Sequence, residues 1–385
     1  MSDLHIPGAP ASAQANDPAS LERLFGTDQG LLPLWIAEPY LPLDSAIVAA
    51  LESRANIGWF GYEVRPSSAL GAFRSWSQRR HGWDPGDFDI AVSPSLGTSI
   101  GAALELVTEP GDAVILQPPV FTDFKPLVTR SHRKVARNSL LLGDGRYVMD
   151  FEGLEALAER PDTTAMILCS PHNPVGRVWT ADELSTVAEI CSAHGVFVIS
   201  DEIHSDIMLG HSRFTPFARA AAPTEVRWIA LHGPIKTFGL AGVADTVIVT
   251  GDDEFAEAFS TMSSRLHLTR NNVFSIAATE AAYTHGDAWL DEMLVLIGRN
   301  VATLRSELPD PLRLIDPDGT YLAWIDLRGL ELDVPQLTRW LPERAHLALS
   351  PGHWFGREGA GFARMSIAVA PEVIEEAIAR LTTAT

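Results

Sequence analysis

Lys236 is the residue of this sequence best placed to act as a nucleophile. It stands in the segment GPIKTFGLAG (233–242), directly after the apolar run Trp228–Leu231. A lysine in such surroundings is poorly solvated, and desolvation lowers its pKa and leaves a neutral amine for Schiff-base chemistry. The alternative is a solvated lysine on a loop, the commoner fate of lysines. A Walker loop does not fit, because Ile235 stands where its glycine would precede the lysine.

A second reactive segment, SDEIH (200–204), follows the apolar run Val196–Ser200. Its Asp201 ends a predicted strand, where a carboxylate could pair with the protonated nitrogen of a cofactor's pyridine ring and keep that ring an electron sink. Strand alternation puts Ile203 on the same side as Asp201, so that Ile203 could pack against the ring. The competing interpretation is a metal cluster or a helix-capping loop formed by Asp201, Glu202, His204 and Asp206.

Asn173 lies in the segment SPHNPVG (170–176), after the apolar run Met166–Leu168. The prolines hold an extended turn, from which the Asn173 amide could reach a ring hydroxyl and a substrate carboxylate. A plain Asn-Pro turn is the competing interpretation. Asn173 precedes Asp201 by 28 positions, and Asp201 precedes Lys236 by 35. These spacings favour the first interpretation because they match those of a known family.

In this order and at these spacings, the three segments resemble those of fold-type-I enzymes that use pyridoxal 5′-phosphate (PLP), the aminotransferase class I/II group. The resemblance extends from PLWIA (33–37) to FARM (362–365). Within the group the chain looks most like the cystathionine β-lyase or C–S β-lyase branch, because His204 stands where typical aminotransferases have a tyrosine. Further branch markers are QPPVF (117–121), GY (61–62), NVF (272–274) and GTYLAW (319–324).

The resemblance implies a role for each matching position around the cofactor ring. Lys236 would carry PLP and remove the substrate's α-proton, and Asp201 would pair with the ring nitrogen. Phe121 would stack on the exposed face of the ring, opposite Ile203. The remaining ring contacts would come from Asn173 and His204.

The resemblance also implies which groups bind the phosphate of the cofactor and the carboxylate of the substrate. The amides of Leu96 and Gly97 and the hydroxyl of Thr98 would bind the phosphate at a helix start, where the helix dipole favours an anion. Tyr62 would reach the phosphate in the neighbouring subunit, which implies a homodimer with shared active sites. The substrate's α-carboxylate would be bound by Arg364, Asn173 and the backbone of Ala37.

The segment around the lysine departs from its relatives, which commonly carry serines one and three residues before it. Those positions are Ile235 and Gly233 here. Gly239 replaces an asparagine that is common three residues after the lysine, and Ala244 replaces a typical aminotransferase arginine. These changes affect the phosphate site and the choice of substrate. His232 is a further candidate phosphate donor, or merely a histidine at a strand end.

Short apolar runs interleaved with amphipathic segments predict the scaffold. The runs suggest strands buried on both faces of a mostly parallel sheet, and they are Phe88–Val92, Ala113–Leu116, Ala165–Leu168, Val196–Ser200, Trp228–Leu231 and Thr246–Thr250. Thr180 and Glu183 form a capping box for a helix that stops at Gly195. Another helix is predicted from near Gly97 to the turn at Pro110.

After about residue 285 the pattern changes to that of a smaller α+β domain. It comprises a long helix (Trp289–Arg305), a strand (Tyr321–Leu327) and a closing helix after Pro371. We therefore predict an α/β protein of PLP-dependent transferase fold type I. An N-terminal arm (1–45) joins the small domain (285–385), and 46–284 form the large PLP-binding domain. The first ~20 residues are predicted to be loose.

Composition limits the class of protein. The 385 residues, 46% hydrophobic and 20% charged, are typical of a soluble globular chain of two domains. The formal net charge of −20 disfavours nucleic acid or an anionic membrane as partner. Cys169 and Cys191 are too few for a disulfide framework, and neither a signal peptide nor an apolar run of ~18 residues is visible. We expect a cytoplasmic protein without a metal.

The leading functional hypothesis is β-elimination from an L-cysteine S-conjugate such as cystathionine, which gives a thiol, pyruvate and ammonia. The alternative is an aminotransferase, which would use the same residues but needs a keto-acid acceptor. The third is a PLP-binding regulatory protein, which the complete catalytic set disfavours. The accepted side group is not determined by the motifs, but we expect specificity residues on the N-terminal arm and around His353 and Trp354.

Overall fold

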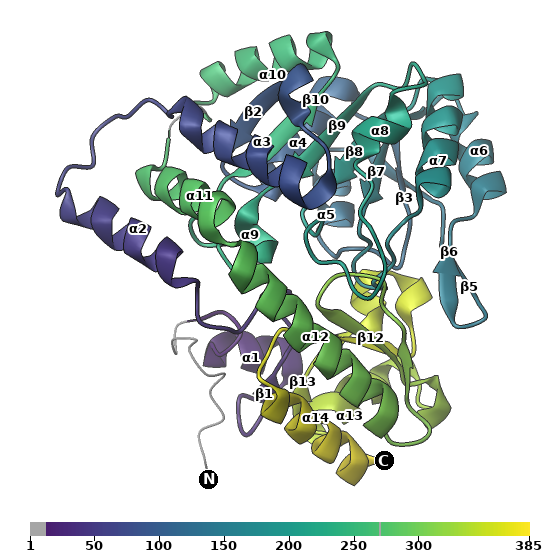
Figure 1. Cartoon of the computed structure of the whole chain (residues 1–385). Coiled ribbons are helices and arrows are strands. Elements are labelled where there is room, and N and C mark those ends of the chain that lie inside the picture. The colour runs from purple at the N-terminus through teal and green to yellow at the C-terminus, as the bar shows by residue number, and fades with distance from the viewer. Residues whose placement is uncertain (1–12, 269–270) are drawn as a thin grey trace.

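Seven strands form the main sheet of the protein, which a computed structural model describes over residues 13–268 and 271–385 (Figure 1). Their order is β2-β10-β9-β8-β7-β3-β4, and all neighbours are parallel except that β10 runs against both β2 and β9. The predicted mostly parallel sheet is therefore confirmed. The strands are β2 (Asp89–Ser93), β3 (Ala113–Leu116), β4 (Lys134–Arg137), β7 (Thr163–Cys169), β8 (Phe197–Asp201), β9 (Trp228–His232) and β10 (Thr246–Thr250).

The six predicted apolar runs each correspond to one of these strands, with ends that differ by at most two residues. The edge strand β4 is not among the predictions. Its sequence, KVAR, has only Ala136 fully buried, and both of its ends are exposed basic residues. An edge strand of this kind carries little of the hydrophobic signal on which the prediction of buried strands rests.

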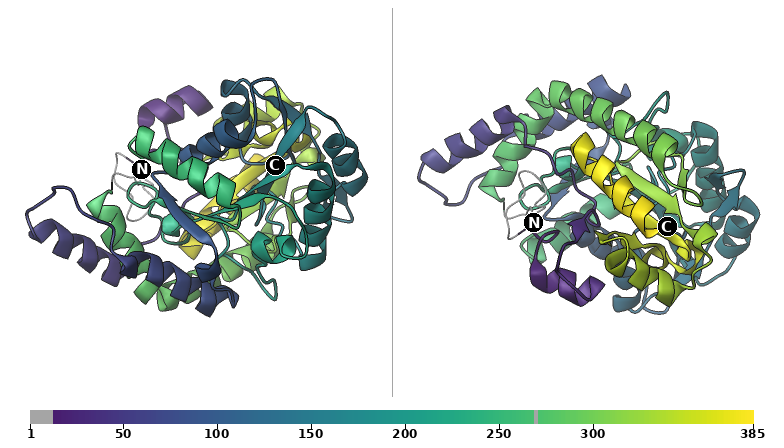
Figure 2. Two further views of the ribbon diagram at one scale, coloured as in Figure 1. Left: turned by 90° about the horizontal axis from the view of Figure 1, so that it is seen from above. Right: turned by 90° about the horizontal axis from the view of Figure 1, so that it is seen from below.

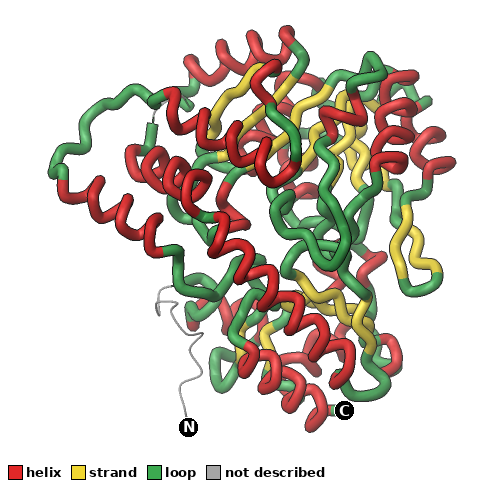
Figure 3. Tube along the Cα trace, viewed as in Figure 1, coloured by secondary structure: helices red, strands yellow, loops and turns green. Residues whose placement is uncertain are grey.

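Helices cover both faces of the main sheet, as Figure 3 shows in red around the yellow strands. Along β7, Ala165 and Ile167 pack into one core cluster, whereas Met166 and Leu168 pack into the other. The first cluster is covered by α4 (Leu96–Val107), α5 (Phe124–Arg130) and α10 (Asp253–Arg265), and the second by α3 (Ser67–His81), α6 (Phe151–Ala158), α7 (Ala181–His194) and α8 (Phe217–Ala221). Burial on both faces explains why these strands read as continuous apolar runs.

Helix α7 forms as its sequence predicts. The Thr180 hydroxyl accepts a hydrogen bond from the Glu183 backbone N–H at 3.1 Å, and the Glu183 carboxylate accepts one from the Thr180 backbone N–H at 2.8 Å. Gly195 closes the helix with a φ of 68°, in the left-handed region that favours glycine. Local sequence therefore sets both ends of this helix.

A second, antiparallel sheet has the strand order β11-β12-β15-β14. Its strands are β11 (Arg313–Ile315), β12 (Leu322–Asp326), β14 (Ser350–Pro351) and β15 (Phe362–Ser366), and the neighbouring helices are α12 (Asp287–Glu307), α13 (Val334–Glu343) and α14 (Pro371–Ala384). The long helix, the strand and the closing helix expected after residue 285 correspond to α12, β12 and α14. The exact domain division at 45 and 284 stays a prediction.

The N-terminal segment is more ordered than its composition suggests. Residues 1–12 of the predicted loose arm lie outside the described residues, but helix α1 (Pro18–Phe25) begins within its last part. The Asp17 side chain accepts the Ser20 backbone N–H at 2.9 Å, and Pro18 occupies the first helical position. Strand β1 (Leu32–Pro33) then pairs in parallel with β13 (Leu347–Ala348).

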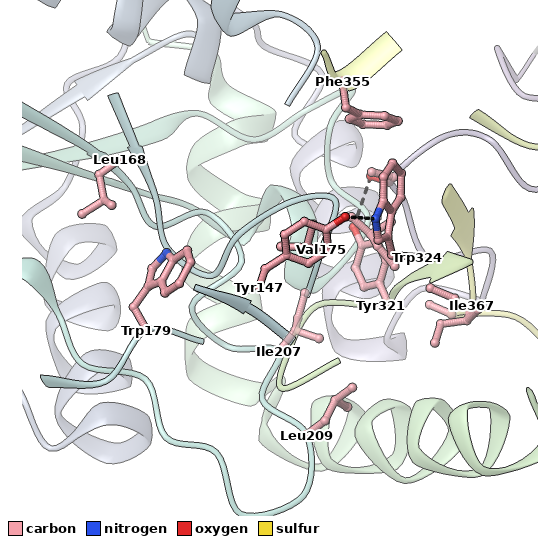
Figure 4. Close-up of a cluster of buried hydrophobic side chains, with 14 of the residues drawn as sticks. Tyr147, Leu168, Val175, Trp179, Ile207, Leu209, Tyr321, Trp324, Phe355 and Ile367 are labelled. Carbon is pink, nitrogen blue, oxygen red and sulfur yellow. Dashed lines mark hydrogen bonds between the residues drawn. The ribbon is translucent and has the colours of Figure 1, made fainter. Parts of the chain in front are cut away.

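A buried cluster joins a short β-hairpin to the second sheet (Figure 4). Tyr147 lies in β6 (Arg146–Val148), which forms a hairpin with β5 (Leu141–Gly143), and points toward Trp324 of β12. The Trp324 indole N–H donates a hydrogen bond of 3.2 Å to the Tyr147 hydroxyl, and Phe355 packs edge-on against Trp324. Residues far apart in the sequence are joined here.

Helix α2 (Ser45–Asn56) stands out from the body of the molecule in both views of Figure 2. It packs against α11 (Val273–His285) and is followed by a segment, 57–66, that leads to α3. No helix within residues 13–268 and 271–385 combines the length and the hydrophobicity that crossing a membrane requires.

Candidate active site

The candidate site lies where the parallel strands end. Phe121 follows β3, Asn173 follows β7 and Asp201 is the last residue of β8. Lys236 follows β9, on the short helix α9 (Pro234–Thr237), which Figure 1 places below the sheet. Parallel strands present their carboxyl ends at one edge, so residues from four separate segments gather there, as is usual for ligand sites in α/β sheets.

A cavity of about 420 Å³ opens at this edge. It brings five of the predicted residues together, and these are Leu96, Gly97, Phe121, Ile203 and Lys236. The amino end of α4 lies at one side and Lys236 at another, and Phe121 and Ile203 contribute apolar side chains. The cavity thus offers an anion-binding helix terminus, an amine and apolar surfaces in one place.

Lys236 occupies the poorly solvated environment that its sequence predicts. Its Nζ donates a hydrogen bond of 2.8 Å to the carbonyl oxygen of Ala37. Burial lowers the pKa of Lys236 to about 8, and the positive charge of Arg364 acts in the same direction, whereas Glu38 and Asp201 oppose it. At pH 7 roughly a tenth of this lysine is therefore a neutral, nucleophilic amine, far more than a solvated lysine would offer.

Asp201 is a buried acid close enough to Lys236 to influence it. Its Oδ1 accepts a hydrogen bond of 3.2 Å from the backbone N–H of Ile203. Burial raises the pKa of Asp201 to about 7, although that hydrogen bond and the charge of Lys236 favour the ionised form. A cationic ring nitrogen placed beside this carboxylate would stabilise its ionised form, because an opposite charge compensates for desolvation.

Arg364 is a buried guanidinium whose partners are all uncharged. It donates to Asn173 Oδ1 at 3.0 Å, to the Trp35 carbonyl at 2.7 Å and to the Ser350 hydroxyl at 3.4 Å. Burial lowers the pKa of Arg364 to about 10, which still leaves it charged at neutral pH. Within the described residues its Nε has no hydrogen-bond partner, and no carboxylate forms an ion pair with it.

A buried charge without a counter-ion is costly, so Arg364 is prepared for an anion. Its bond to Asn173 brings together two residues that are 191 positions apart in the sequence. The third predicted carboxylate ligand, Ala37, uses its carbonyl oxygen to accept from Lys236 and, at 3.2 Å, from the Tyr321 hydroxyl. Its backbone N–H is the group that could donate to a carboxylate.

His204 lies fully inside the site, with its ring edge-on to Tyr321 at 5.7 Å between centroids. Burial lowers the pKa of His204 well below its usual value, and the charges of Lys236 and Arg364 act in the same direction. Its ring is therefore neutral. Its Nδ1 has no hydrogen-bond partner among residues 13–268 and 271–385, so a polar group is available beside Lys236.

The other acidic side chains near Asp201 do not converge on a common point. Glu202 accepts from the Ser200 hydroxyl at 2.9 Å and from the Phe217 backbone N–H at 2.8 Å, and its other oxygen lies 3.3 Å from His232 Nε2. Burial raises the pKa of Glu202 to about 8 and lowers that of His232 to about 3, so this close pair is uncharged at neutral pH. No three potential metal ligands gather in the described part of the chain.

Asp206, for which the sequence suggested only a metal cluster or a helix-capping loop, holds the helix that carries the lysine. Its carboxylate accepts from the Thr237 hydroxyl at 2.7 Å, and from the Trp76 indole and His81 Nε2 at 2.8 Å each. Burial alone would raise the pKa of Asp206, but these three donors hold it below its usual value. The contact to Trp76 spans 130 positions, and no local pattern predicts it.

Ser95 is a second residue of the site that none of the motifs indicates. It caps α4, and its hydroxyl accepts the Thr98 backbone N–H at 3.1 Å and lies 2.9 Å from the Thr98 hydroxyl. Ser95 lines the cavity, whereas Thr98 is not among the residues that line it. A serine directly before a predicted helix start is a recognisable N-cap signal and could have revealed it.

Tyr62 and His232 lie apart from this cavity. Tyr62 is 83% exposed in the segment between α2 and α3. His232 packs against Glu202, Phe73 and Trp83 and does not line the cavity. We therefore leave His232 out of the proposed phosphate site.

Comparisons with known proteins agree with this arrangement. The family model for aminotransferase class I and II matches residues 68–381. Cystathionine β-lyase PatB of Bacillus subtilis is 37% identical over 365 residues, which cover 94% of each chain.

Two solved structures share the fold. Cystalysin from Treponema denticola, which contains a PLP cofactor, superposes with a TM-score of 0.90 at 27% identity, over 98% of this chain and 97% of its own. The PLP-bound C–S lyase from Staphylococcus hominis, complexed with the inhibitor L-cycloserine, gives 0.90 at 26% identity, over 98% and 96%.

Proposed function

The chain belongs to the aminotransferase class I and II family, and from this premise we propose that it is a PLP-dependent carbon–sulfur β-lyase. Its substrate would be an L-cysteine S-conjugate such as cystathionine. With one water molecule, the conjugate would give a thiol, pyruvate and ammonia. The main support for an amino-acid substrate is Arg364. This buried guanidinium is close to Lys236 and forms no ion pair with a carboxylate in the described residues.

The residues present fit PLP. The amino end of α4, with Ser95, Leu96 and Gly97 at the cavity, suits a phosphate. Phe121 and Ile203 would hold the two faces of the ring. The Asp201 carboxyl could pair with the ring nitrogen. The Nδ1 of His204, which has no hydrogen-bond partner in the described residues, offers a further polar contact. Lys236 supplies the amine to which the aldehyde would be attached.

When bound, PLP supplies the electron sink that makes the substrate's α-proton acidic. Arg364 and Asn173 would hold the α-carboxylate, which fixes the orientation of the substrate's Cα. Lys236, freed when the substrate's amine takes its place, would then take the α-proton at its Nζ, since its lowered pKa leaves part of the amine unprotonated near neutral pH. Asp201, when ionised, would keep the ring nitrogen protonated. The thiolate is a good leaving group and needs no strong acid beside the sulfur.

We also propose a homodimer with shared active sites. The segment after α2 exposes five large apolar side chains, Ile57, Trp59, Phe60, Tyr62 and Val64, which are between 53% and 91% exposed. An exposed apolar patch of this kind typically marks an interaction surface. A second copy that covers it would place Tyr62 in a partner's site. Light scattering at working concentrations should give twice the chain mass, and a monomer would contradict the proposal.

One assay separates the lyase from an aminotransferase. We expect the purified protein with PLP to form pyruvate and free thiol from cystathionine in the absence of any keto acid. An aminotransferase would instead require an added keto acid and would form the corresponding amino acid. The absence of turnover of any amino acid under both conditions would favour a PLP-binding regulatory protein.

Arg364→Ala should mainly weaken substrate binding. The loss of a charge-assisted, bidentate contact corresponds to about a ten- to hundredfold increase in the apparent KM. Arg364→Lys should recover part of the loss, because it keeps the charge but not the planar fork. Thermal melting should confirm that both variants fold, and an unchanged KM in Arg364→Ala would show that this residue does not bind the carboxylate.

Thr98→Val and Tyr62→Phe should each release PLP more readily than the wild type. With Gly233 and Ile235 in place of two hydroxyl donors, each remaining phosphate contact matters more, because an unpaired buried phosphate oxygen is costly. The double variant should be largely free of PLP after dialysis. Thr186→Val, on α7, is the matched control and should retain the cofactor. Full PLP retention in both single variants would show that neither the Thr98 hydroxyl nor the Tyr62 hydroxyl holds the phosphate.

A further inference from the structure

A second cavity, of about 380 Å³, adjoins the candidate active site. Phe121 lines both cavities, so they adjoin at this residue. Phe355 also lines the second cavity, and the guanidinium of Arg364 lies 4.8 Å from the centre of its ring. The second cavity therefore lies beside both the proposed position of the PLP ring and the proposed site of the α-carboxylate.

The charges around this cavity contrast with those of the whole chain. Lys125, Arg137 and Arg357 line it, and among the described residues no aspartate or glutamate does. The chain as a whole has a formal net charge of −20. A basic cavity in an acidic protein is a local feature that attracts anions.

Not all of this positive charge is neutralised nearby. The Glu358 carboxylate does not line the cavity, but it lies 3.2 Å from Arg137 and 3.3 Å from Arg357. One carboxylate therefore pairs with two guanidinium groups. Lys125, on α5, forms no ion pair or hydrogen bond through its ammonium within residues 13–268 and 271–385. Arg137 and Arg357 thus share one carboxylate, and Lys125 is available to a ligand.

We propose that this second cavity binds the S-substituent of the substrate and selects substituents that end in a carboxylate. The inference rests on the proposed lyase function and names the substrate class within it. A substrate whose α-carboxylate is bound at Arg364 and whose Cα lies at Lys236 would extend its side chain past Phe121 into the cavity. Lys125 and Arg357 would contact the distal carboxylate, while Trp354 and Val135 contribute apolar walls for the thioether chain.

Three matched cysteine thioethers test the proposal. They are S-(2-carboxyethyl)-, S-propyl- and S-(2-aminoethyl)-L-cysteine, which differ mainly in terminal charge. We expect the wild type to show the highest kcat/KM for pyruvate formation with the carboxyethyl compound and the lowest with the aminoethyl compound. Equal values for all three would overturn the proposed selectivity while leaving the lyase function intact.

Variants at Lys125 assign the selectivity to this cavity. Lys125→Gln should lower kcat/KM for the carboxyethyl compound by about fivefold, the upper end for one solvent-accessible ion pair, with less than a twofold effect on the propyl compound. Lys125→Glu should shift the preference toward the aminoethyl compound. Lys134→Gln, on the neighbouring strand β4 and outside the cavity lining, is the control and should behave as the wild type. An unchanged charge preference in both Lys125 variants would overturn the proposal.

If none of the compounds yields pyruvate, a binding measurement still tests whether the cavity selects a carboxylate. That result would overturn the proposed lyase function for these substrates, but calorimetry with the PLP-loaded protein can still compare affinities for the carboxyethyl and propyl compounds. Tighter binding of the carboxyethyl compound that is lost in Lys125→Gln would support the cavity's role. Equal affinities in the wild type would overturn it.

Discussion

Lys236→Ala should lower kcat for β-elimination by more than about 10⁴-fold, because the variant loses the group proposed both to attach PLP and to take the α-proton. The sequence contains only two other lysines, Lys125 and Lys134. Lys134 lies on β4, and Lys125 lies beyond Phe121 in the neighbouring cavity, so neither is placed to replace Lys236. The visible absorbance of lysine-bound PLP should disappear with the activity.

Two measurements make this prediction decisive. Borohydride reduction of the wild type followed by peptide mapping should find PLP on Lys236, whereas the variant should keep no PLP after reduction and dialysis. Lys134→Ala is the matched control and should retain both colour and activity. A Lys236→Ala protein that keeps its absorbance after this treatment would show that another amine carries the cofactor.

The pKa of Lys236 adds a pH dependence to cofactor loading. Burial lowers that pKa to about 8, so the amine is mostly protonated at pH 6 and mostly neutral at pH 9. Only the neutral amine attacks an aldehyde. The rate at which cofactor-free protein captures PLP should therefore increase with pH up to about 8 and then level off. A rate that keeps increasing toward pH 10.5 would indicate an ordinary, solvated lysine.

Asp201→Ala should retain part of its PLP but lower kcat by about 10²- to 10³-fold, in line with the loss of one preorganised electrostatic contact. Without the buried carboxylate the ring nitrogen loses its counter-ion, and a neutral ring accepts electrons poorly. Asp201→Asn should lose as much activity, although it keeps an oxygen that can accept from the Ile203 backbone N–H.

Comparison of the two Asp201 variants separates charge from structure. Near-normal activity in Asp201→Asn would show that the carboxylate charge is unimportant and that the alanine effect is structural. Near-normal rates in both variants would mean that another residue keeps the ring nitrogen protonated. PLP content should be measured in each case, so that a loss of cofactor is not mistaken for a loss of rate.

Much of this scaffold follows from the sequence because its signals are local. The central apolar runs of the main sheet are strands because both faces of these strands are buried, which leaves no polar alternation. Thr180 and Glu183 set the start of α7, and Gly195 sets its end, through contacts within a few residues. The segments that contain Asn173, Asp201 and Lys236 lie near the ends of such runs, so the sequence alone could place them at one edge of a parallel sheet.

Tertiary structure decided how distant side chains meet within the site. The bond from Lys236 to Ala37 spans 199 positions, and the bond from Arg364 to Asn173 spans 191. The anchoring of Thr237 by Asp206 and the cavity that contains both Lys125 and Arg357 likewise depend on how separate helices and loops pack. Local patterns fix which face of an element is buried, but not which polar atoms come within 3 Å of one another. The sequence therefore determined the sheet and the proposed reactive residues, whereas packing between distant segments decided their electrostatic environment and the shape of the cavity beside them.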